Sequence, residues 1–348
     1  MDEVELLLAL VARYSPSGHE GAAVRCFVQC ARRLGYRAHV DAVGNGVARR
    51  GRGRPRTVFL GHIDTVEGAL PVVRRHGRVG GRGVVDAKGA LATALVAGAG
   101  HTGPGSLEIV ATVGEETDSR GARHLLRRRN VDAVIAGEPS HWDGITIGYR
   151  GDVRLVAHFR GRRSHFSSPR PTTADRALEW AATARAVGND PGPSPFRSTT
   201  AKVVAVRSGA SGDREWTDVT IDIRLPPGRS ARTFRDELPS LPTGSTLELI
   251  ASIDPLELSR ANPVARALEA GVRATGGQPT LWRKTGTSDL NLVVPAWTVP
   301  GAAYGPGDPH LDHSAFESIS ERELHRSVSV LAHAFLELSA RPGAAGPA

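Results

Sequence analysis

Three short apolar runs constrain this chain most, because each contains or leads into a glycine that adjoins a histidine or an acid. They are TVFLGHI at 57–63, LEIVATV at 107–113 and VDAVIAG at 131–137. Runs of this length are typical of strands buried on both faces of a sheet. Helical patterns at 87–100 and 119–129 separate them, and strands that alternate with helices predict a sheet with parallel strands, covered by helices. We therefore expect an α/β fold.

The pattern changes near Tyr149. Residues 150–258 contain about four strand patterns and two helical patterns, which is typical of a ferredoxin-like α+β insert. Helical patterns return at 263–275 and 321–338. We predict three segments: a first part of the main domain at 1–149, the insert at 150–258, and a second part of the main domain at 259–348.

The N-terminal segment predicts two amphipathic helices. The first covers residues 2–13. Ser17-Gly18-His19-Glu20 has the spacing of a capping box and would open the second helix, which ends near Gly35.

Polar side chains gather where the first buried strand ends. His62 and Asp64 lie two residues apart and would project from the same side of the strand. Open α/β sheets bind ligands at such carboxyl ends, although an ordinary polar pair at a strand end would look the same. Asp86 stands at a loop-to-helix junction, where an acid can be a helix N-cap or a carboxylate that bridges two cations.

The other two buried strands also lead into acids. Glu115 and Glu116 follow one strand, and Glu138 follows the next. Adjacent acids repel each other unless a cation or a proton separates them; two solvated loop acids are the alternative. A late Asp312-His313-Ser314 adds a histidine, with His310 as a rival three residues earlier. Together, acids and histidines at successive strand ends predict a metal site.

Composition excludes a disordered chain, a collagen and a coiled coil. Hydrophobic residues make up 40% and charged residues 23% of 348 residues, an ordinary globular balance. No apolar run approaches the roughly 18 residues that span a bilayer, and the acidic start MDEVELLL lacks the basic residues of an export signal. Cys26 and Cys30 are expected to be buried free thiols. We expect a cytoplasmic protein that binds no membrane.

Charge leaves two interpretations open. The chain carries 41 arginines and only three lysines, and its net charge is +8. Such a balance fits attraction to an acidic partner, and it equally fits an arginine-rich soluble surface. The densest basic run, Arg49–Arg56, has no interleaved aromatic residues, so we do not expect nucleic acid as a partner.

The motifs GHID, GGRGVVDAKGA, GEET, GEPS and the late DHS resemble those of the M20 family of di-zinc aminoacyl and peptide hydrolases. The resemblance covers essentially the whole chain. It implies a zinc-dependent exopeptidase-like catalytic domain with a mixed sheet, and an inserted lid and dimerisation domain. Within the family, IAGEPS, IGYRG, KTGTSDLN and AYGPGDPHLDHS resemble the hydrolases that release lysine or ornithine from an amino-group carrier protein.

The resemblance implies a role for each acid and histidine. One zinc ion would be held by His62, Asp86 and Glu138. The other would be held by Asp86, Glu116 and His313, with Asp86 bridging. Ligands of this kind suit zinc, and cobalt or manganese could substitute. Glu115 would be the general base, and Asp64 the acid that supports His62.

Further residues match the family with less specific signals. His165 matches a lid histidine that reaches the partner subunit's active site and stabilises an oxyanion, which implies a homodimer; a surface histidine is the alternative. The loop that contains Lys284, Thr287, Ser288 and Asp289 resembles a substrate-pocket segment, and a helix N-cap at Ser288 or Asp289 is the alternative. Arg224 could contact substrate or simply lie at a strand edge.

The expected activity is hydrolysis of the amide that joins lysine, or ornithine, to the γ-carboxyl of the C-terminal glutamate of a small acidic carrier protein, in lysine or arginine biosynthesis. A succinyl-diaminopimelate desuccinylase, an acetylornithine deacetylase or a dipeptidase would carry the same metal ligands. A non-catalytic basic binding protein is a remote alternative.

Overall fold

The computed structural model describes residues 1–128, 130–165 and 167–340. Contacts along the chain divide it into two units. Unit 1 comprises Met1–Ile147, Leu258–Trp282 and the chain from Ser288 onward, and unit 2 comprises Gly148–Glu257 and Arg283–Thr287. Each unit is described by itself below.

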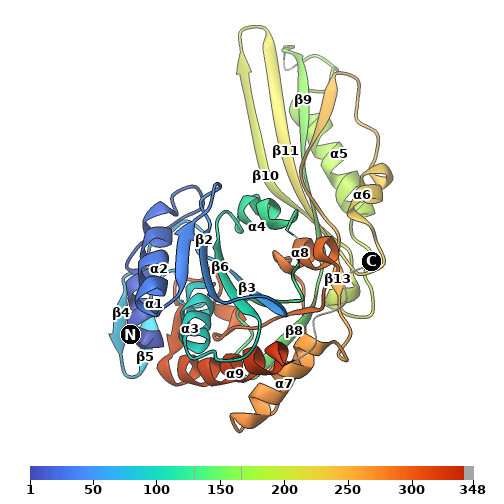
Figure 1. Ribbon diagram of the computed structural model, residues 1–348. Helices are drawn as coiled ribbons and strands as arrows, with labels where there is room; N and C mark the ends of the chain where they lie inside the picture. Colours follow the sequence, from blue (N-terminus) through green and yellow to red (C-terminus); the bar gives the residue numbers. More distant parts are fainter. Residues whose placement is uncertain (129, 166, 341–348) are drawn as a thin grey trace. The chain divides into compact units, whose positions relative to one another are not determined.

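Unit 1 is built on a mixed sheet with the strand order β1-β2-β6-β3-β7-β15-β8, and β14 also pairs with β8. Figure 1 labels β2, β3, β6 and β8 of this sheet. β3 lies between β6 and β7 and runs parallel to both, and β15 is parallel to β7. The strands are β1 (Arg37–Val40), β2 (Gly46–Gly51), β3 (Arg56–His62), β6 (Ser106–Thr112), β7 (Ala133–Gly137), β8 (Gly144–Tyr149), β14 (Thr280–Lys284) and β15 (Gly301–Ala303). The α/β fold with a mixed sheet, predicted from the buried runs, is confirmed.

Helices bury both faces of this sheet. Phe59 of β3 packs edge-on against Phe335 of α9, with ring centroids 6.3 Å apart. Its neighbours Val58 and Leu60 are also buried and point to the opposite face, because side chains alternate along a strand. The helices are α1 (Glu3–Val11), α2 (Gly21–Arg33), α3 (Lys88–Ala99), α4 (Arg120–Leu125), α7 (Pro263–Ala274), α8 (Leu290–Trp297) and α9 (Glu321–Ser339).

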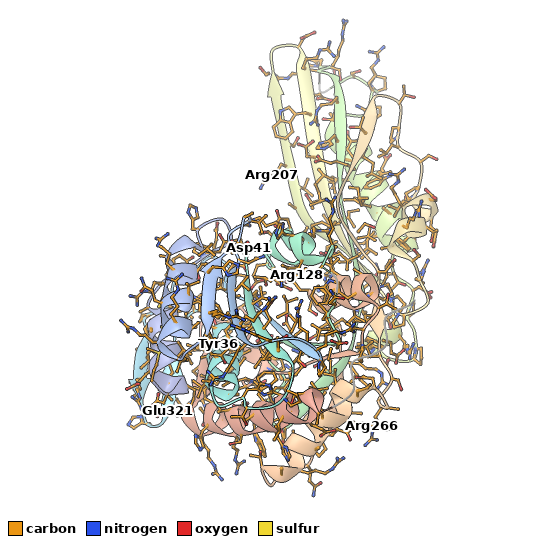
Figure 2. The ribbon with its side chains drawn as sticks, in the orientation of Figure 1. Tyr36, Asp41, Arg128, Arg207, Arg266 and Glu321 are labelled. Atoms are coloured by element: carbon orange, nitrogen blue, oxygen red, sulfur yellow. The ribbon has the colours of Figure 1, made fainter. Side chains whose placement is uncertain are left out.

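Side-chain hydrogen bonds fix helices of unit 1 to one another and to the sheet. Tyr36, labelled in Figure 2, donates from its hydroxyl to the carbonyl of Leu95 in α3 at 2.8 Å. A small sheet with the order β16-β5-β4 stands beside the large one. Its strands are β4 (Val73–Arg75), β5 (Arg78–Gly80) and β16 (Ser318–Ser320).

Unit 2 is an antiparallel sheet with the order β10-β11-β9-β12, and α5 and α6 pack on it. Phe159 and Trp180 meet in its core, with ring centroids 6.0 Å apart. Its elements are β9 (Gly151–Arg162), α5 (Thr173–Val187), β10 (Thr200–Ser211), β11 (Arg214–Leu225), α6 (Ala231–Phe234), β12 (Ser245–Ile253) and β13 (Leu256–Glu257), with 3₁₀ turns at Pro195–Arg197 and Arg235–Glu237.

Two local predictions were wrong. The capping box does not form, because the Ser17 hydroxyl donates to Asp64 at 2.6 Å and Glu20, the residue at the N-cap, makes no side-chain cap. The helix predicted for 119–129 spans only Arg120–Leu125, since the arginines that follow offer no apolar face; residue 129 itself lies outside the described residues.

Candidate metal centre

The first buried strand delivers a histidine to the carboxyl edge of the sheet. His62 is the last residue of β3 and is 2% exposed. Its Nε2 lies 2.9 Å from Oδ1 of Asp86, and its Nδ1 lies 3.0 Å from the backbone oxygen of Asp64. The contact through Nδ1 leaves Nε2 as the nitrogen that faces the cluster.

Asp86 lies between two histidines. It precedes α3, and its Oδ2 is 3.1 Å from Nε2 of His313, which in turn lies 3.1 Å from Oε1 of Glu116. The two oxygens of Asp86 therefore face two different imidazoles. This is the geometry that a carboxylate shared between two cations requires.

The structure brings all five predicted ligands together in unit 1. They form two groups that share Asp86, and within each group the potential ligand atoms lie within 4.8 Å of one another. One group is His62, Asp86 and Glu138, and the other is Asp86, Glu116 and His313. Neither group contains a cysteine, so both offer only imidazole nitrogen and carboxylate oxygen.

Electrostatics in the cluster favour positive charge. Burial alone would lower the pKa of His62, but its hydrogen bond to Asp86 and the charges of Asp86, Glu115 and Asp64 raise it well above the ordinary value. Hydrogen bonds to Asp86 and Glu116 raise the pKa of His313 to about 10. Protons on these histidines neutralise the surrounding carboxylates, and divalent cations would take the same role.

The pKa of Asp86 is shifted in the opposite direction, below its ordinary value. Burial would raise its pKa, but hydrogen bonds from His313 and His62 outweigh burial and lower the pKa below the ordinary range. The lowered pKa favours the ionised form of Asp86, which is the form that binds metal.

Glu115 has a different place in the cluster from its neighbour Glu116, which belongs to a ligand group. Burial raises the pKa of Glu115 well above the ordinary value; the charge of His62 opposes this rise, and the negative charges of Glu138, Asp289 and Glu116 add to it. Glu115 belongs to neither ligand group. A carboxyl group with a raised pKa beside candidate metal ligands is suited to accept and return a proton.

Asp64 organises the strand end. It is fully buried, and it accepts hydrogen bonds from the Ser17 hydroxyl and from the backbone N–H groups of Glu115 and Glu116, both at 3.2 Å. Its Oδ1 is 3.7 Å from Nδ1 of His62. It thus orients a ligand and the neighbouring acid without belonging to either ligand group.

Two residues near the centre were missed by sequence reasoning. Ser17 was assigned to a helix cap and instead contacts Asp64. Asp289 was considered only as a pocket or cap residue, but it is 3% exposed and accepts from the Thr112 hydroxyl at 3.1 Å. No spacing rule links 289 to 112, so the sequence held no signal for this contact.

The remaining predicted residues lie elsewhere. Ser288, in unit 1, accepts the backbone N–H of Leu290 at 3.3 Å, as a residue at a helix start does. His165 belongs to unit 2, is exposed, and contacts the Ser167 hydroxyl at 2.7 Å through Nδ1. His310 lies in a 3₁₀ turn and belongs to neither ligand group.

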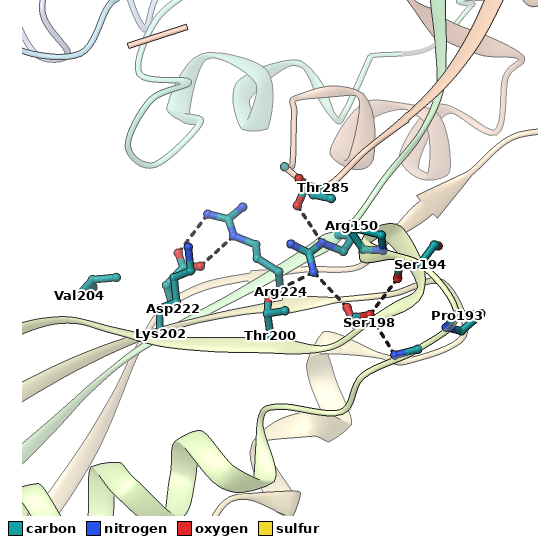
Figure 3. A pocket seen from close by; sticks show the side chains of 13 residues that line it. Arg150, Pro193, Ser194, Ser198, Thr200, Lys202, Val204, Asp222, Arg224 and Thr285 are labelled. Atoms are coloured by element: carbon teal, nitrogen blue, oxygen red, sulfur yellow. Dashed lines mark hydrogen bonds and ion pairs between the residues drawn. The ribbon is translucent and has the colours of Figure 1, made fainter. Parts of the chain in front are cut away.

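Unit 2 contains a basic pocket of about 960 Å³, shown in Figure 3. Arg224 donates to the Thr287 hydroxyl at 3.0 Å and pairs with Asp222 at 2.8 Å. Arg150, which sequence reasoning did not single out, donates to the carbonyl of Thr285 at 2.9 Å. Burial first, and then the charge of Arg224, lower the pKa of Arg150, so two guanidinium groups lie near each other in this pocket.

Lys202 adds a third cation to the lining of this pocket. Lys284 belongs to unit 2 but is not among the residues that line it.

Comparisons with known proteins agree with this geometry. The sequence profile described as Peptidase family M20/M25/M40 matches residues 58–337. The LysW-lysine hydrolase of Deinococcus radiodurans is 37% identical, and the match covers 96% of each chain. A protein of Thermococcus kodakarensis, provisionally named a LysW-lysine/LysW-ornithine hydrolase, is 35% identical over 97% of this chain and 92% of its own.

Solved structures share the fold at low sequence identity. The di-peptidase Dug1p of Saccharomyces cerevisiae gives a TM-score of 0.79 at 13% identity, covering 98% of this chain and 96% of that one. An M20 family metallo-carboxypeptidase of Sulfolobus solfataricus gives 0.75 at 15% identity, covering 97% and 99%. At these identities the likeness concerns the fold alone.

Proposed function

Because this chain belongs to peptidase family M20/M25/M40, we propose that the cluster at the edge of its sheet is the catalytic centre of a metal-dependent amide hydrolase. The family match spans residues 58–337. The observation that carries the proposal is the sharing of Asp86 between two groups of potential ligands beside Glu115.

We propose two zinc ions per chain. His62, Asp86 and Glu138 would hold one ion, and Asp86, Glu116 and His313 would hold the other. The residues fit: nitrogen and oxygen donors lie within 4.8 Å of one another, and carboxylates outnumber histidines. Cobalt or manganese would suit the same donors. Such a pair of cations would polarise the scissile carbonyl and increase the acidity of the attacking water.

Glu115 would then move the proton. Its raised pKa allows it to accept a proton from the attacking water and to return it to the nitrogen of the leaving amine. Asp64 accepts a hydrogen bond from the backbone N–H of Glu115 and so fixes the backbone position from which the Glu115 side chain extends. The chain thereby supplies both the positioning and the proton transfer of amide hydrolysis.

The substrate we propose is lysine, or ornithine, attached to the γ-carboxyl of the C-terminal glutamate of an acidic amino-group carrier protein. Relatives named for this activity match 96% and 97% of the chain, at 37% and 35% identity. Arg224 and Thr287, which are hydrogen-bonded in unit 2, are suited to bind a substrate carboxylate. Lys284 and Ser288 lie close to Thr287 in the sequence and are proposed as further contacts.

We also propose a cytoplasmic homodimer that assembles through unit 2. His165 is exposed and its Nε2 is free of the contact that Nδ1 makes with Ser167, so it could donate to an oxyanion in the partner subunit's site. Cys26 and Cys30 are buried free thiols, as expected in a reducing compartment. None of the helices in the described part of the chain is long and apolar enough to cross a bilayer.

One assay separates the candidate substrates. Purified enzyme with zinc would be given carrier-linked lysine, acetylornithine and succinyl-diaminopimelate, and the kcat/KM values compared. The proposal expects the carrier-linked substrate to be preferred. A higher value for either small substrate would replace the proposed function with the corresponding deacylase.

A further inference from the structure

Glu317 is a buried acid close to the proposed metal centre that no role above includes. It lies four residues after His313 and is 3% exposed. It belongs to neither ligand group. Its Oε1 accepts three backbone N–H groups, those of Gly83 at 2.9 Å, Val85 at 3.0 Å and Asp86 at 3.2 Å.

The other oxygen of Glu317 binds a buried arginine. Arg82 is 9% exposed and donates from Nη1 to Oε2 of Glu317 at 3.0 Å. The same guanidinium also donates to two backbone oxygens, that of Gly68 at 3.0 Å and that of Ser314 at 3.1 Å. One arginine therefore joins three segments of the chain: its own, that of Gly68, and that of Ser314 and Glu317.

These three segments carry three of the five proposed ligands. Gly68 lies in the loop that follows His62, Arg82 lies in the loop that leads to Asp86, and Ser314 is the residue after His313. Residues 81–87 form neither helix nor strand, so their N–H groups need partners outside regular structure. Glu317 supplies these partners for the loop that ends at Asp86.

The pair is suited to fix geometry. Hydrogen bonds to an ionised group are shorter and stronger than those between neutral groups, and a fully satisfied polar network in a buried site is rigid. The backbone N–H of Asp86 is itself one of the donors to Glu317. Glu317 thus fixes the backbone position from which the side chain of Asp86, the residue shared by both ligand groups, extends.

We propose that the Arg82–Glu317 pair is a positioning device that sets the affinity of the metal centre, by fixing the loops of His62, Asp86 and His313 relative to one another. This rests on the metal centre proposed above. Both residues act through the ligands and contact neither cation.

Metal binding tests the proposal without any substrate. Metal-free protein would be titrated with zinc against a chromophoric chelator. Glu317→Gln keeps the size of the side chain but turns an NH₂ group toward either the three backbone N–H groups or Arg82. We expect the zinc dissociation constant to rise about 10–100-fold, the usual effect of losing a partner that holds a ligand in place.

A second Glu–Arg pair nearby provides a matched control. Glu321, at the start of α9 and labelled in Figure 2, pairs with Arg74 at 2.8 Å, and both of its carboxylate oxygens accept from that arginine rather than from a ligand loop. Glu321→Gln should leave the zinc isotherm unchanged. Urea unfolding of the metal-free proteins, run in parallel, reports any general loss of stability.

Each result of the zinc titration leads to a different conclusion. A zinc isotherm of Glu317→Gln that coincides with wild type, whatever its urea midpoint, would overturn the proposal and leave the pair with a structural role only. If Glu317→Gln does not fold, Arg82→Lys carries the same test, since one ammonium cannot reach all three acceptors. Wild-type protein that binds no zinc would instead refute the metal centre, and zinc-bound protein that fails to cleave would refute the proposed substrate.

Discussion

At the scale of single residues, the proposed chemistry depends on giving neighbouring acids different environments. Asp86 lies between two imidazoles, which lower its pKa, whereas burial and nearby carboxylates raise the pKa of Glu115. One acid is thereby kept as an anion for metal, and the other has an increased affinity for a proton.

Replacing Glu115 tests this division. Glu115→Gln removes the proton acceptor and leaves both ligand groups intact, so zinc binding should be unchanged while kcat falls about 10²–10⁴-fold. Steady-state kinetics and metal analysis would be measured on the same preparation. Asp118→Asn, an acid in the same loop whose side chain is 63% exposed, should retain activity. Substantial turnover by Glu115→Gln would mean that another group is the base.

Asp289 should make the metal-free protein less stable as pH rises. Burial raises its pKa from 3.8 to about 6, against hydrogen bonds from Ser119 and Thr112 and the charge of His62. The folded state therefore binds more protons than the unfolded state between these values, so stability falls as pH rises from about 4 to about 6 and stays lower above that.

Asp289→Asn removes this penalty, since the amide does not titrate. Urea unfolding at pH 4 to 7 should show no difference from wild type at pH 4 and a stabilisation of up to about 3 kcal/mol at pH 7. Parallel curves for the two proteins across this range would contradict the assignment.

The site residues divide by how they could be found. His62 ends one buried strand, and Glu115 and Glu138 follow two others, so the apolar runs alone placed these residues on one edge of the sheet. Asp86 and His313 lie in loops, where the sequence offered each beside an alternative, a helix N-cap for Asp86 and His310 for His313, and the family resemblance decided between them. Asp289 and Glu317 make contacts with partners far away in the sequence, which no local pattern encodes.

At the scale of elements, glycines set how closely the central strands and helices approach. A Cβ at Gly137, the last residue of β7, would lie 2.7 Å from the ring of Phe59 and 3.2 Å from Cβ of Ala90 in α3. The residue after it is Glu138, so packing at this point also positions a proposed ligand.

Gly137→Ala should overpack this contact and lower the free energy of unfolding by about 1–3 kcal/mol. Gly100→Ala is the control, because its Cβ would meet only the carbonyl of Ala97 at 3.9 Å. Urea midpoints would be compared for both. Equal midpoints for the two variants would show that the Phe59 ring moves aside freely.

Long elements were predictable and short ones were not. The three buried strands followed from continuous apolar runs, and the helices α3, α7 and α9 followed from helical patterns over many residues. The strands of the small sheet have three residues each, too few for a period to appear, and their pairing joins residues far apart in the sequence. The end of α4 at Leu125 was not predicted, because it depends on where the apolar face of the helix stops.

At the scale of the whole molecule, the proposed homodimer would make each active site from two chains. If His165 acts in the partner subunit's site, Glu115→Gln and His165→Ala chains are each inactive, yet their heterodimer contains one complete site. Mixing equal amounts after dissociation should restore up to about a quarter of wild-type activity, because random pairing makes half the dimers mixed. Failure of the mixture, with heterodimers demonstrated by mass, would place His165 outside the partner's site.

The central claim is that five side chains distant in the sequence hold two divalent cations. Anomalous diffraction from zinc-soaked crystals, recorded on both sides of the zinc edge, tests it most directly. The account predicts two peaks per chain, one among His62, Asp86 and Glu138 and one among Asp86, Glu116 and His313. Peaks at other residues, or none at these after full zinc loading, would contradict it.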